Sequence, residues 1–256
     1  MEREYLFLVY VGIIGLLLGS FFNVVGLRIP KGESIIKPRS HCPSCKHALT
    51  AWELIPVVSY VIQRGKCRGC GVKISPVYPL IELITAILFT ISPFLVGWSK
   101  ELVISWTLIS LLVIIVVSDI HYMIIPDKVL LFFAVLFIIE RIFVSLTPWW
   151  DSLIGAIVGF LLLLLIAVVS KGGMGGGDIK LFALLGFVFG WKMILLVFFF
   201  STFYGTIFGL IGMVLGKVHR GKPMPFGPYI ALGTLTVYFF GQTIVNTYIE
   251  LILSRV

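Results

Sequence analysis

The chain has 256 residues, of which 59% are hydrophobic and 12% are charged, and its mean hydropathy is +1.09. This composition excludes an ordinary soluble globular protein and indicates a membrane protein. The formal net charge of +8 reflects which loops hold the lysines and arginines, so it gives no reason to expect a nucleic-acid partner.

Apolar runs follow one another along the chain, and a helix needs about 20 mainly apolar residues to cross a bilayer. The first run is expected to stay as an anchor, because Met1-Glu2-Arg3-Glu4 is not net basic and no small-residue cleavage site follows it. Only Gly190-Trp191-Lys192 separates the short sixth run from the seventh. We predict an all-α polytopic membrane protein with about eight transmembrane helices. The runs cover residues 5–27, 79–97, 102–118, 128–146, 152–170, 179–190, 191–216 and 228–252.

The orientation of these helices is predicted from the positions of Lys and Arg, because loops rich in these residues stay in the cytoplasm. With eight spans, alternate loops share a side; one side then holds fifteen Lys and Arg residues and the other holds five. The richer set includes the segment 28–78 and is expected to be cytoplasmic, which leaves both termini outside. The five residues of the poorer set are Arg3, Lys100, Arg141, Lys192 and Arg255.

Residues 28–78 form the only sizeable polar segment and contain all four cysteines of the chain. Two C-x-x-C motifs stand 21 residues apart, and Gly69 and Gly71 suit the tight turns of such knuckles. This spacing predicts an inserted zinc-ribbon-like loop. Four protein ligands leave no open position for water, so the expected zinc is structural. Disulfides are the rival interpretation, but thiols stay reduced in the cytoplasm. The expected ligands are Cys42, Cys45, Cys67 and Cys70.

The same loop is strongly basic. Nine Lys and Arg residues against Glu33 and Glu53 give it a charge of +7, or +5 with a four-thiolate zinc centre. Such a surface suits the anionic lipids of the inner leaflet, so membrane lipids are expected partners. It would repel a basic peptide.

A glycine-rich stretch, residues 172–177, lies between two apolar runs and is followed by Asp178. Irregular backbone at membrane depth is tolerated only where protein buries it or where it lines a wet cavity. An acid there indicates a functional site. A flexible linker in which Asp178 caps the next helix is an equally good interpretation, because Asp is a favoured N-cap residue.

Two further acids follow the third apolar run. Asp127 comes after Pro126 and before an apolar run, which favours a helix-capping role. Asp119 has no such role, and it is expected at the cytoplasmic end of span three, as Asp178 is at the cytoplasmic start of span six. In a helix bundle such acids can meet, and two carboxylates that share a proton and a water are the minimum for aspartic proteolysis. His121 is expected to be an interfacial or surface histidine rather than a ligand, since no second histidine motif accompanies it.

Other polar and small residues in the spans are expected to serve packing. Asn23 needs a hydrogen-bond partner, most simply across a helix interface. Glu82 lies within a turn of the membrane edge, which favours an interfacial acid over part of a polar site. Gly15 and Gly19, like Gly155 and Gly159, have the spacing that lets helices approach closely.

Taken in order, these motifs resemble the prepilin peptidases, which are membrane aspartic proteases of the Gly-x-Gly-Asp type, and most closely those of Gram-positive competence systems. The resemblance covers nearly the whole chain. Its motifs are Gly19-Ser20-Phe21 with Asn23, Arg28-Ile29-Pro30, the four-cysteine loop ending in Tyr78-Pro79 with Glu82, Asp119 with Ile125-Pro126-Asp127, Gly173 to Leu181, and Pro225-Phe226-Gly227-Pro228.

The resemblance implies that Asp119 and Asp178 are the catalytic pair. It also implies type IV prepilins and pseudopilins as substrates, cut after a glycine at the cytoplasmic surface of a bacterial cell membrane. Many members with the cysteine loop also methylate the new N-terminus, so S-adenosylmethionine is a cofactor if that activity is present. The implied domains are a first helix at 1–27, a zinc-binding domain at 28–78 and a protease domain with seven helices at 79–256.

Two other classes of protein place acids among membrane helices. A proton- or cation-coupled transporter would do so, but it explains neither the cysteine motifs nor the glycine run. A non-enzymatic scaffold would use the zinc loop to bind partners, but it leaves Asp119 and Asp178 without a purpose.

Overall fold

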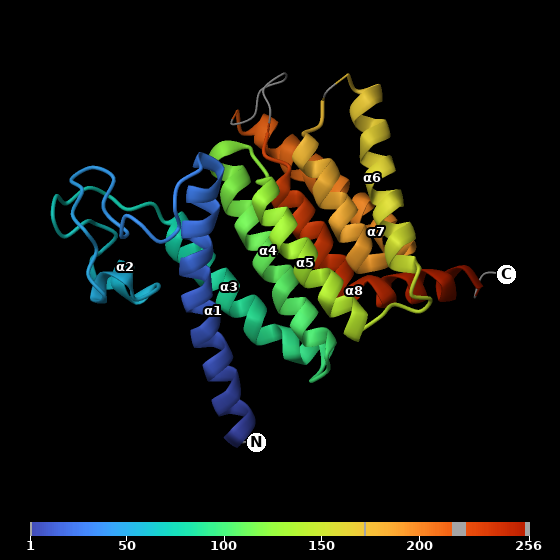
Figure 1. The fold of residues 1–256 in the computed structure, drawn as a ribbon, viewed down its shortest axis with the longest axis horizontal. Coiled ribbons are helices and arrows are strands. Elements are labelled where there is room, and N and C mark those ends of the chain that lie inside the picture. Colours follow the sequence, from blue (N-terminus) through green and yellow to red (C-terminus); the bar gives the residue numbers. More distant parts are fainter. Residues whose placement is uncertain (1, 172, 217–223, 254–256) are drawn as a thin grey trace. The chain divides into compact units, whose positions relative to one another are not determined.

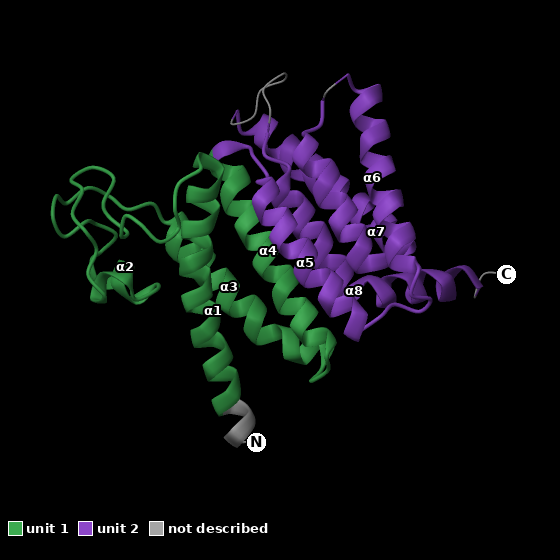
Figure 2. Ribbon diagram, in the orientation of Figure 1, with its two compact units in different colours: residues 1–121 green, residues 122–256 purple. Residues whose placement is uncertain are grey.

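The computed structural model describes residues 2–171, 173–216 and 224–253, and within these ranges the chain is helical without β-strands. The contacts divide it into two compact units, Met1–His121 and Tyr122–Val256 (Figure 2). This division differs from the domain boundaries expected from the sequence, which remain a prediction. Each unit is described by itself.

Unit 1 contains three long helices, α1 (Glu2–Arg28), α3 (Val77–Val96) and α4 (Glu101–Tyr122). α1 packs antiparallel to α3 along its glycine face. A Cβ on Gly15 would lie 2.7 Å from the Cα of Ala86, and one on Gly19 would lie 2.8 Å from the Cα of Glu82. The expected small-residue interface is therefore confirmed, because only glycine permits these backbone distances.

α4 joins this pair through polar and aromatic contacts. The Ser105 hydroxyl donates to the Ser92 hydroxyl at 3.1 Å, and the Trp106 indole donates to the Phe89 carbonyl at 3.1 Å. Near its end, α4 meets α1, since a Cβ on Gly26 would lie 2.8 Å from the Val117 side chain. The last turns of α1 and α4 therefore lie at the same end of unit 1.

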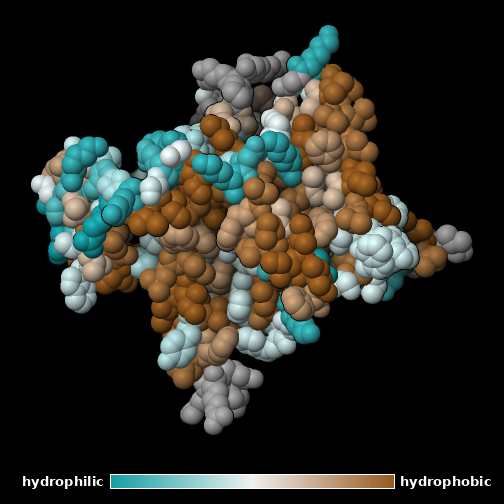
Figure 3. Space-filling model, viewed as in Figure 1, coloured by the Kyte–Doolittle hydropathy of each residue, from teal (hydrophilic) through white to brown (hydrophobic). Residues whose placement is uncertain are grey.

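The loop between α1 and α3 contains three short helices, η1 (Ile29–Lys31), η2 (Trp52–Leu54) and α2 (Val58–Ile62). Figure 1 shows this loop beside α1 and α3, and Figure 3 shows hydrophilic residues over much of it. The long helices instead present mainly hydrophobic residues in the same view (Figure 3). This contrast fits helices in hydrocarbon and a loop that reaches water.

Unit 2 consists of α5 (Asp127–Phe143), α6 (Asp151–Val169), α7 (Gly176–Val214) and α8 (Gly227–Leu253). α7 packs against both α6 and α8. The starts of α5, α7 and α8 and the end of α7 lie at one end of the unit, at the top of Figure 1.

α7 is a helical hairpin rather than one straight helix. At Gly190 the φ of 77° and ψ of 172° are not helical. A Cβ on Gly159 of α6 would touch the carbonyl oxygen of Phe182 and lie 3.2 Å from Cγ1 of Ile194. In an unbroken helix Phe182 and Ile194 would be about 18 Å apart. Both can flank Gly159 only because the chain folds back between them.

Two polar side chains hold this reversal. Arg141 is buried, and its Nη2 donates to the Val188 carbonyl at 2.6 Å, near the end of the first α7 segment. The Asp151 carboxylate accepts a hydrogen bond from the Trp191 N–H at 3.3 Å, at the start of the second segment. A cation therefore meets a helix C-terminus and an anion meets an N-terminus, which is the favourable arrangement at each end.

The all-helical membrane architecture expected from the sequence is confirmed. Within the described ranges, six helices are long and apolar enough to cross a membrane: α1, α3, α4, α6, α7 and α8. The expected count was eight. The difference arises because α5 has only 17 residues and because the sixth and seventh runs are the two segments of α7 on either side of Gly190.

Candidate functional site

Asp119 lies in the last turn of α4 and is buried, with 6% of its surface exposed. Its neighbour Ser118 is fully buried. His121 is exposed at the helix end, with Nδ1 2.9 Å from the Val117 carbonyl oxygen, as expected for a surface histidine. The helix thus carries an acid to its end without exposing it to bulk water.

Asp178 lies in the first turn of α7 and is half-buried. The N-cap residue is Gly175, and the Asp178 N–H donates to the Gly175 carbonyl at 3.1 Å. The interpretation of Asp178 as the N-cap is therefore wrong, because Gly176 and Gly177 are already helical. Its carboxylate is at the positive end of the helix without serving as the cap.

Two glycines of the motif have identifiable packing roles. A Cβ on Gly175 would lie 3.0 Å from Oδ2 of Asp178, so the absence of a side chain leaves space for the carboxylate. A Cβ on Gly177 would lie 2.7 Å from Cβ of Ile125, so this glycine lets the helix start pack closely against the segment before α5. Gly176 has no atom within 4 Å of the equivalent position.

Asp127 is not the helix cap that the sequence favoured. The N-cap of α5 is Pro126, and the Asp127 carboxylate instead forms an ion pair with Lys180, at 2.8 Å and 2.7 Å to its two oxygens. Both side chains are largely exposed. They close one end of an open groove of about 380 Å³ between α5 and α7 that is otherwise apolar. The other lining residues are Leu130, Leu131, Ala134, Ile138, Ala183, Leu184 and Phe187.

The four cysteines converge as predicted. All four Sγ atoms lie within 4.8 Å of one another, with Cys42 and Cys70 3.8 Å apart and Cys45 and Cys67 3.9 Å apart. A tetrahedral zinc with Zn–S bonds of about 2.3 Å has sulfur–sulfur edges of about 3.8 Å. A disulfide would bring two sulfurs to about 2.05 Å, and the cysteines are free thiols. The residues therefore fit a zinc ion.

The two cysteine knuckles repeat the same backbone pattern. The Cys42 N–H donates to the His47 carbonyl and the Cys67 N–H donates to the Val72 carbonyl, both at 2.9 Å. Lys46 and Gly71 occupy the matching turn positions with φ of 60° and 71°. The tight turn that the glycines predicted is present at Gly71 with a left-handed backbone, and Lys46 adopts the same conformation without being a glycine.

The knuckle backbone also shapes the acidity of the thiols. Hydrogen bonds from the backbone of Cys45 and Ser44 lower the pKa of Cys42 to about 6. The Val72 backbone lowers the pKa of Cys70, but desolvation and the surrounding thiols outweigh it and raise the pKa to about 12. Like charges at this separation oppose one another, so a cation is needed before all four sulfurs can be thiolates.

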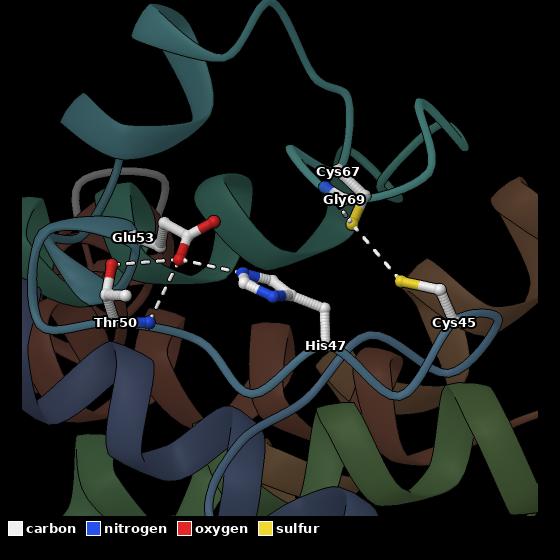
Figure 4. Close-up of polar contacts among 6 residues, drawn as sticks. All are labelled: Cys45, His47, Thr50, Glu53, Cys67 and Gly69. Carbon is white, nitrogen blue, oxygen red and sulfur yellow. Dashed lines mark hydrogen bonds and ion pairs between the residues drawn. The ribbon is translucent and has the colours of Figure 1, made fainter.

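A buried acid behind the first knuckle is a residue whose role the sequence reasoning missed. The Glu53 side chain is 3% exposed, and its Oε2 lies 3.2 Å from Nε2 of His47 (Figure 4). The same oxygen accepts hydrogen bonds from the N–H and hydroxyl of Thr50 at 2.9 Å and 2.8 Å. These contacts, the Thr50 N–H first, lower the pKa of Glu53. The Thr-x-x-Glu spacing of a capping box was the available signal.

His47 connects this acid to the second knuckle. A Cβ on Gly69 would lie 3.3 Å from the Cβ of His47 and 3.3 Å from the Cys45 sulfur. The Gly69 N–H donates to the Cys67 sulfur at 3.4 Å. Glu53 therefore orients His47 against the turn that presents Cys67.

Comparison with known proteins identifies the family. Residues 13–95 match the model of the bacterial peptidase A24 N-terminal domain, and residues 106–210 match the model of the type IV leader peptidase family. Together they cover the second half of α1, the cysteine loop, nearly all of α3, most of α4 and the Asp178 region. The chain belongs to the type IV leader peptidase family. No solved structure matches it.

Full-length relatives support this membership. The chain is 46% identical over 242 residues to the prepilin leader peptidase/N-methyltransferase of Bacillus subtilis (strain 168), covering 94% of this chain and 98% of the relative. It is 34% identical to the protein of the same name from Aeromonas salmonicida (strain A449), covering 97% and 96%. The protein of that name from Pseudomonas aeruginosa PAO1 is 34% identical, covering 93% and 92%. The resemblance inferred from the motifs is confirmed.

Two buried residues of the family motifs form hydrogen bonds within unit 1. One joins α1 to α3, and the other joins α3 to the cysteine loop. Asn23 is buried, and its Nδ2 donates to the Tyr78 carbonyl at 3.2 Å, which confirms its packing role between α1 and α3. Glu82 is also buried, and its Oε2 accepts a hydrogen bond from the Val57 N–H at 2.8 Å. The interpretation of Glu82 as an interfacial acid that reaches water is therefore wrong; it anchors the loop.

Proposed function

We propose that this leader peptidase family member is a membrane aspartic endopeptidase that removes the short leader of type IV prepilins or pseudopilins, with Asp119 and Asp178 as its catalytic pair. The observation that carries the proposal is that family membership coincides with two acids at the ends of apolar helices. Asp119 is in the last turn of α4 and Asp178 in the first turn of α7.

The chemistry needs one carboxylate as base and the other as acid. The base deprotonates a water, which attacks the glycyl carbonyl of the scissile bond. The acid donates its proton to the developing oxyanion, and a proton finally reaches the leaving amine. Cleavage by this route uses the two carboxylates alone.

The helix ends favour Asp178 as the base and Asp119 as the acid. A helix N-terminus stabilises a carboxylate, and a C-terminus disfavours one. This assignment places the shared proton of the pair on Asp119. Infrared spectra of Asp119→Asn and Asp178→Asn, each compared with the wild type under the conditions of the cleavage assay, should show the protonated-carboxyl band missing from Asp119→Asn. A band missing only from Asp178→Asn would assign the roles the other way.

The chain is a multi-pass membrane protein, and we propose the cytoplasmic face for the cysteine loop and both acids, with the termini outside. The excess of Lys and Arg in one set of alternate loops supports this orientation. The α7 hairpin supports this orientation too. If its two segments cross the membrane in opposite directions, both ends of α7 lie on the same side. A prepilin is cut just before its own apolar helix, so its scissile bond would reach the enzyme at this membrane surface.

We propose a structural role for zinc in the loop. Cys42, Cys45, Cys67 and Cys70 would hold the ion, and four thiolate ligands leave no position for a reacting water. The names of the relatives include N-methyltransferase, so a methyl transfer from S-adenosylmethionine to the new N-terminus is the second activity proposed here. No residue is assigned to it.

Cleavage of a full-length prepilin by the purified protein tests the proposal. Asp119→Asn and Asp178→Asn should each abolish cleavage, whereas Asp127→Asn should retain it as a matched acid at a neighbouring helix start. Cys45→Ser should lose bound zinc but retain measurable cleavage, and a chelator should leave the rate unchanged over the assay.

Persistence of cleavage in either aspartate variant would remove that residue from the mechanism. Ion flux altered by the same variants, with cleavage absent from the wild type, would favour the transporter. Loss of partner binding in Cys45→Ser alone would favour the scaffold.

A further inference from the structure

The cysteine loop is anchored to α3 at a point several residues after the start of that helix. The Val57 N–H donates to Glu82 Oε2 at 2.8 Å, and Glu82 lies five residues inside α3 (Val77–Val96). At 1.5 Å per residue this places the contact about 7 Å from the start of α3. Because Gly19 of α1 packs against Glu82, the contact is also well inside α1, which ends at Arg28.

The backbone at the anchor is strained. Val57 has φ 60° and ψ −51°, and the Val58 N–H donates to the Pro56 carbonyl across it. This is a tight turn with positive φ at a β-branched residue, a conformation that costs free energy and persists only where its surroundings impose it. The Glu82 carboxylate is one such constraint, because it fixes the N–H of the strained residue. α2 begins at Val58, directly after this turn.

The segment that follows this anchor exposes apolar side chains. α2 carries Val61 and Ile62, 66% and 68% exposed, and the neighbouring η2 carries Trp52, 78% exposed. On its other side, α2 is fixed to the second knuckle, since the Tyr60 ring packs on Gly65 and its hydroxyl lies 3.5 Å from the Ile74 carbonyl oxygen. Val61 and Ile62 therefore lie on other faces of α2 than the one on which Tyr60 contacts the knuckle.

We propose that η2 and α2 form an interfacial membrane-docking element that inserts its apolar side chains into the lipid leaflet beside α3. With the start of α3 taken as the membrane surface, the anchor lies about 7 Å deep, within the range of about 5–10 Å to which interfacial helices bury their apolar face. The inserted residues are Trp52, Val58, Val61 and Ile62.

The charge of the surrounding loop fits the same partner. Nine Lys and Arg residues lie between Arg28 and Lys73, against two acids. Basic groups above an apolar insert match a leaflet with anionic headgroups over hydrocarbon. A tryptophan at the level between the two is the residue type enriched at this boundary.

The same loop offers a matched control position. Ile36 is 77% exposed, almost as much as Trp52. It follows Ser34, whose carbonyl accepts a hydrogen bond from Arg28 at the end of α1 and whose hydroxyl accepts one from the Ile36 N–H. Ile36 therefore belongs to the part of the loop fixed at the helix end rather than beside α3, and we expect it to face water.

Fluorescence quenching of the full-length protein in vesicles tests the proposal. The vesicles contain phosphatidylcholine and phosphatidylglycerol with bromine on the acyl chains, at one protein or fewer per vesicle, so that lipid is the available partner. The Trp52 signal is the tryptophan fluorescence of the wild type minus that of Trp52→Phe. The control carries Trp52→Phe together with Ile36→Trp, and its signal is taken against Trp52→Phe alone.

We expect brominated lipid to reduce the Trp52 signal at least about two-fold and aqueous acrylamide to have little effect; acrylamide is neutral, so the basic loop does not concentrate it. The position-36 signal should show the opposite pattern. Trp52 quenched by acrylamide but not by brominated lipid would overturn the proposal. Equal lipid quenching at both positions would also overturn it, because the loop would then lie on the membrane without a specific insert.

Discussion

The helices that carry the two acids are held in different ways. Most side chains of α4 are buried, among them the apolar Leu108, Leu111 and Ile115, and Asp119 is buried with them. The first segment of α7 also buries apolar residues, such as Leu181, Phe182 and Leu185, but it begins after glycines and ends at a reversal where Arg141 and Asp151 make polar contacts. Apolar burial therefore holds both helices, and the first segment of α7 has in addition two polar contacts at its reversal.

The largest expected effect is on the space beside Asp178. Gly175→Ala would place a methyl group 3.0 Å from Oδ2 of Asp178 and displace the carboxylate. Because Oδ2 would have to move by a few tenths of an ångström and a misplacement of about 1 Å can cost about 100-fold in rate, we expect the cleavage rate to fall by roughly 3- to 10-fold. Gly176→Ala is the matched control, since it meets no atom within 4 Å, and its rate should stay near that of the wild type. Equal losses in both variants would show that glycine is needed for substrate access instead.

The next effect is on stability at the reversal of α7. Arg141→Ala removes the donor to the Val188 carbonyl, and a buried hydrogen bond to a charged group contributes about 2 kcal/mol. Thermal unfolding in detergent should show this loss, and Arg141→Lys should recover part of it. For comparison, Ile115→Val in α4 should cost about 1 kcal/mol. An Arg141→Ala loss no greater than that of Ile115→Val would contradict the idea that polar contacts hold α7.

The smallest effect is expected at the exposed ion pair. Lys180→Met removes the partner of Asp127, but both side chains are more than half exposed, and such pairs contribute about 0–1 kcal/mol. Cleavage should change less than about two-fold, and the difference should shrink as salt screens the pair. A loss as large as that of Gly175→Ala would mean that this pair positions the start of α7.

Much of the architecture could be predicted because apolar runs and C-x-x-C spacing are local signals. The capping roles assigned to Asp127 and Asp178 were wrong because they depend on where a helix begins. Glycine propensity placed Gly176 and Gly177 in a loop, whereas in the structure both lie in α7 and Gly177 packs on Ile125. Tertiary contact overrode propensity there.

The roles of Glu82 and Arg141 could not be predicted from spacing. Glu82 binds a loop residue 25 positions earlier and Arg141 binds a carbonyl 47 positions later. In the sequence, Arg141 counts among the loop charges that orient the helices in the membrane. That count does not indicate whether the side chain is buried. Long-range partners of this kind become visible only when the chain is folded.

The hairpin at Gly190 has a consequence for the membrane around the enzyme. The segment from Gly176 to Phe189 is about 21 Å long at 1.5 Å per residue, whereas the hydrocarbon core is about 30 Å thick. Such hydrophobic mismatch is relieved by local thinning of the bilayer or by drawing the short helix below the headgroups. Asp178 is at the start of this segment, so the thickness of the bilayer affects how readily water reaches its carboxylate. The cleavage rate should therefore change with the length of the lipid acyl chains.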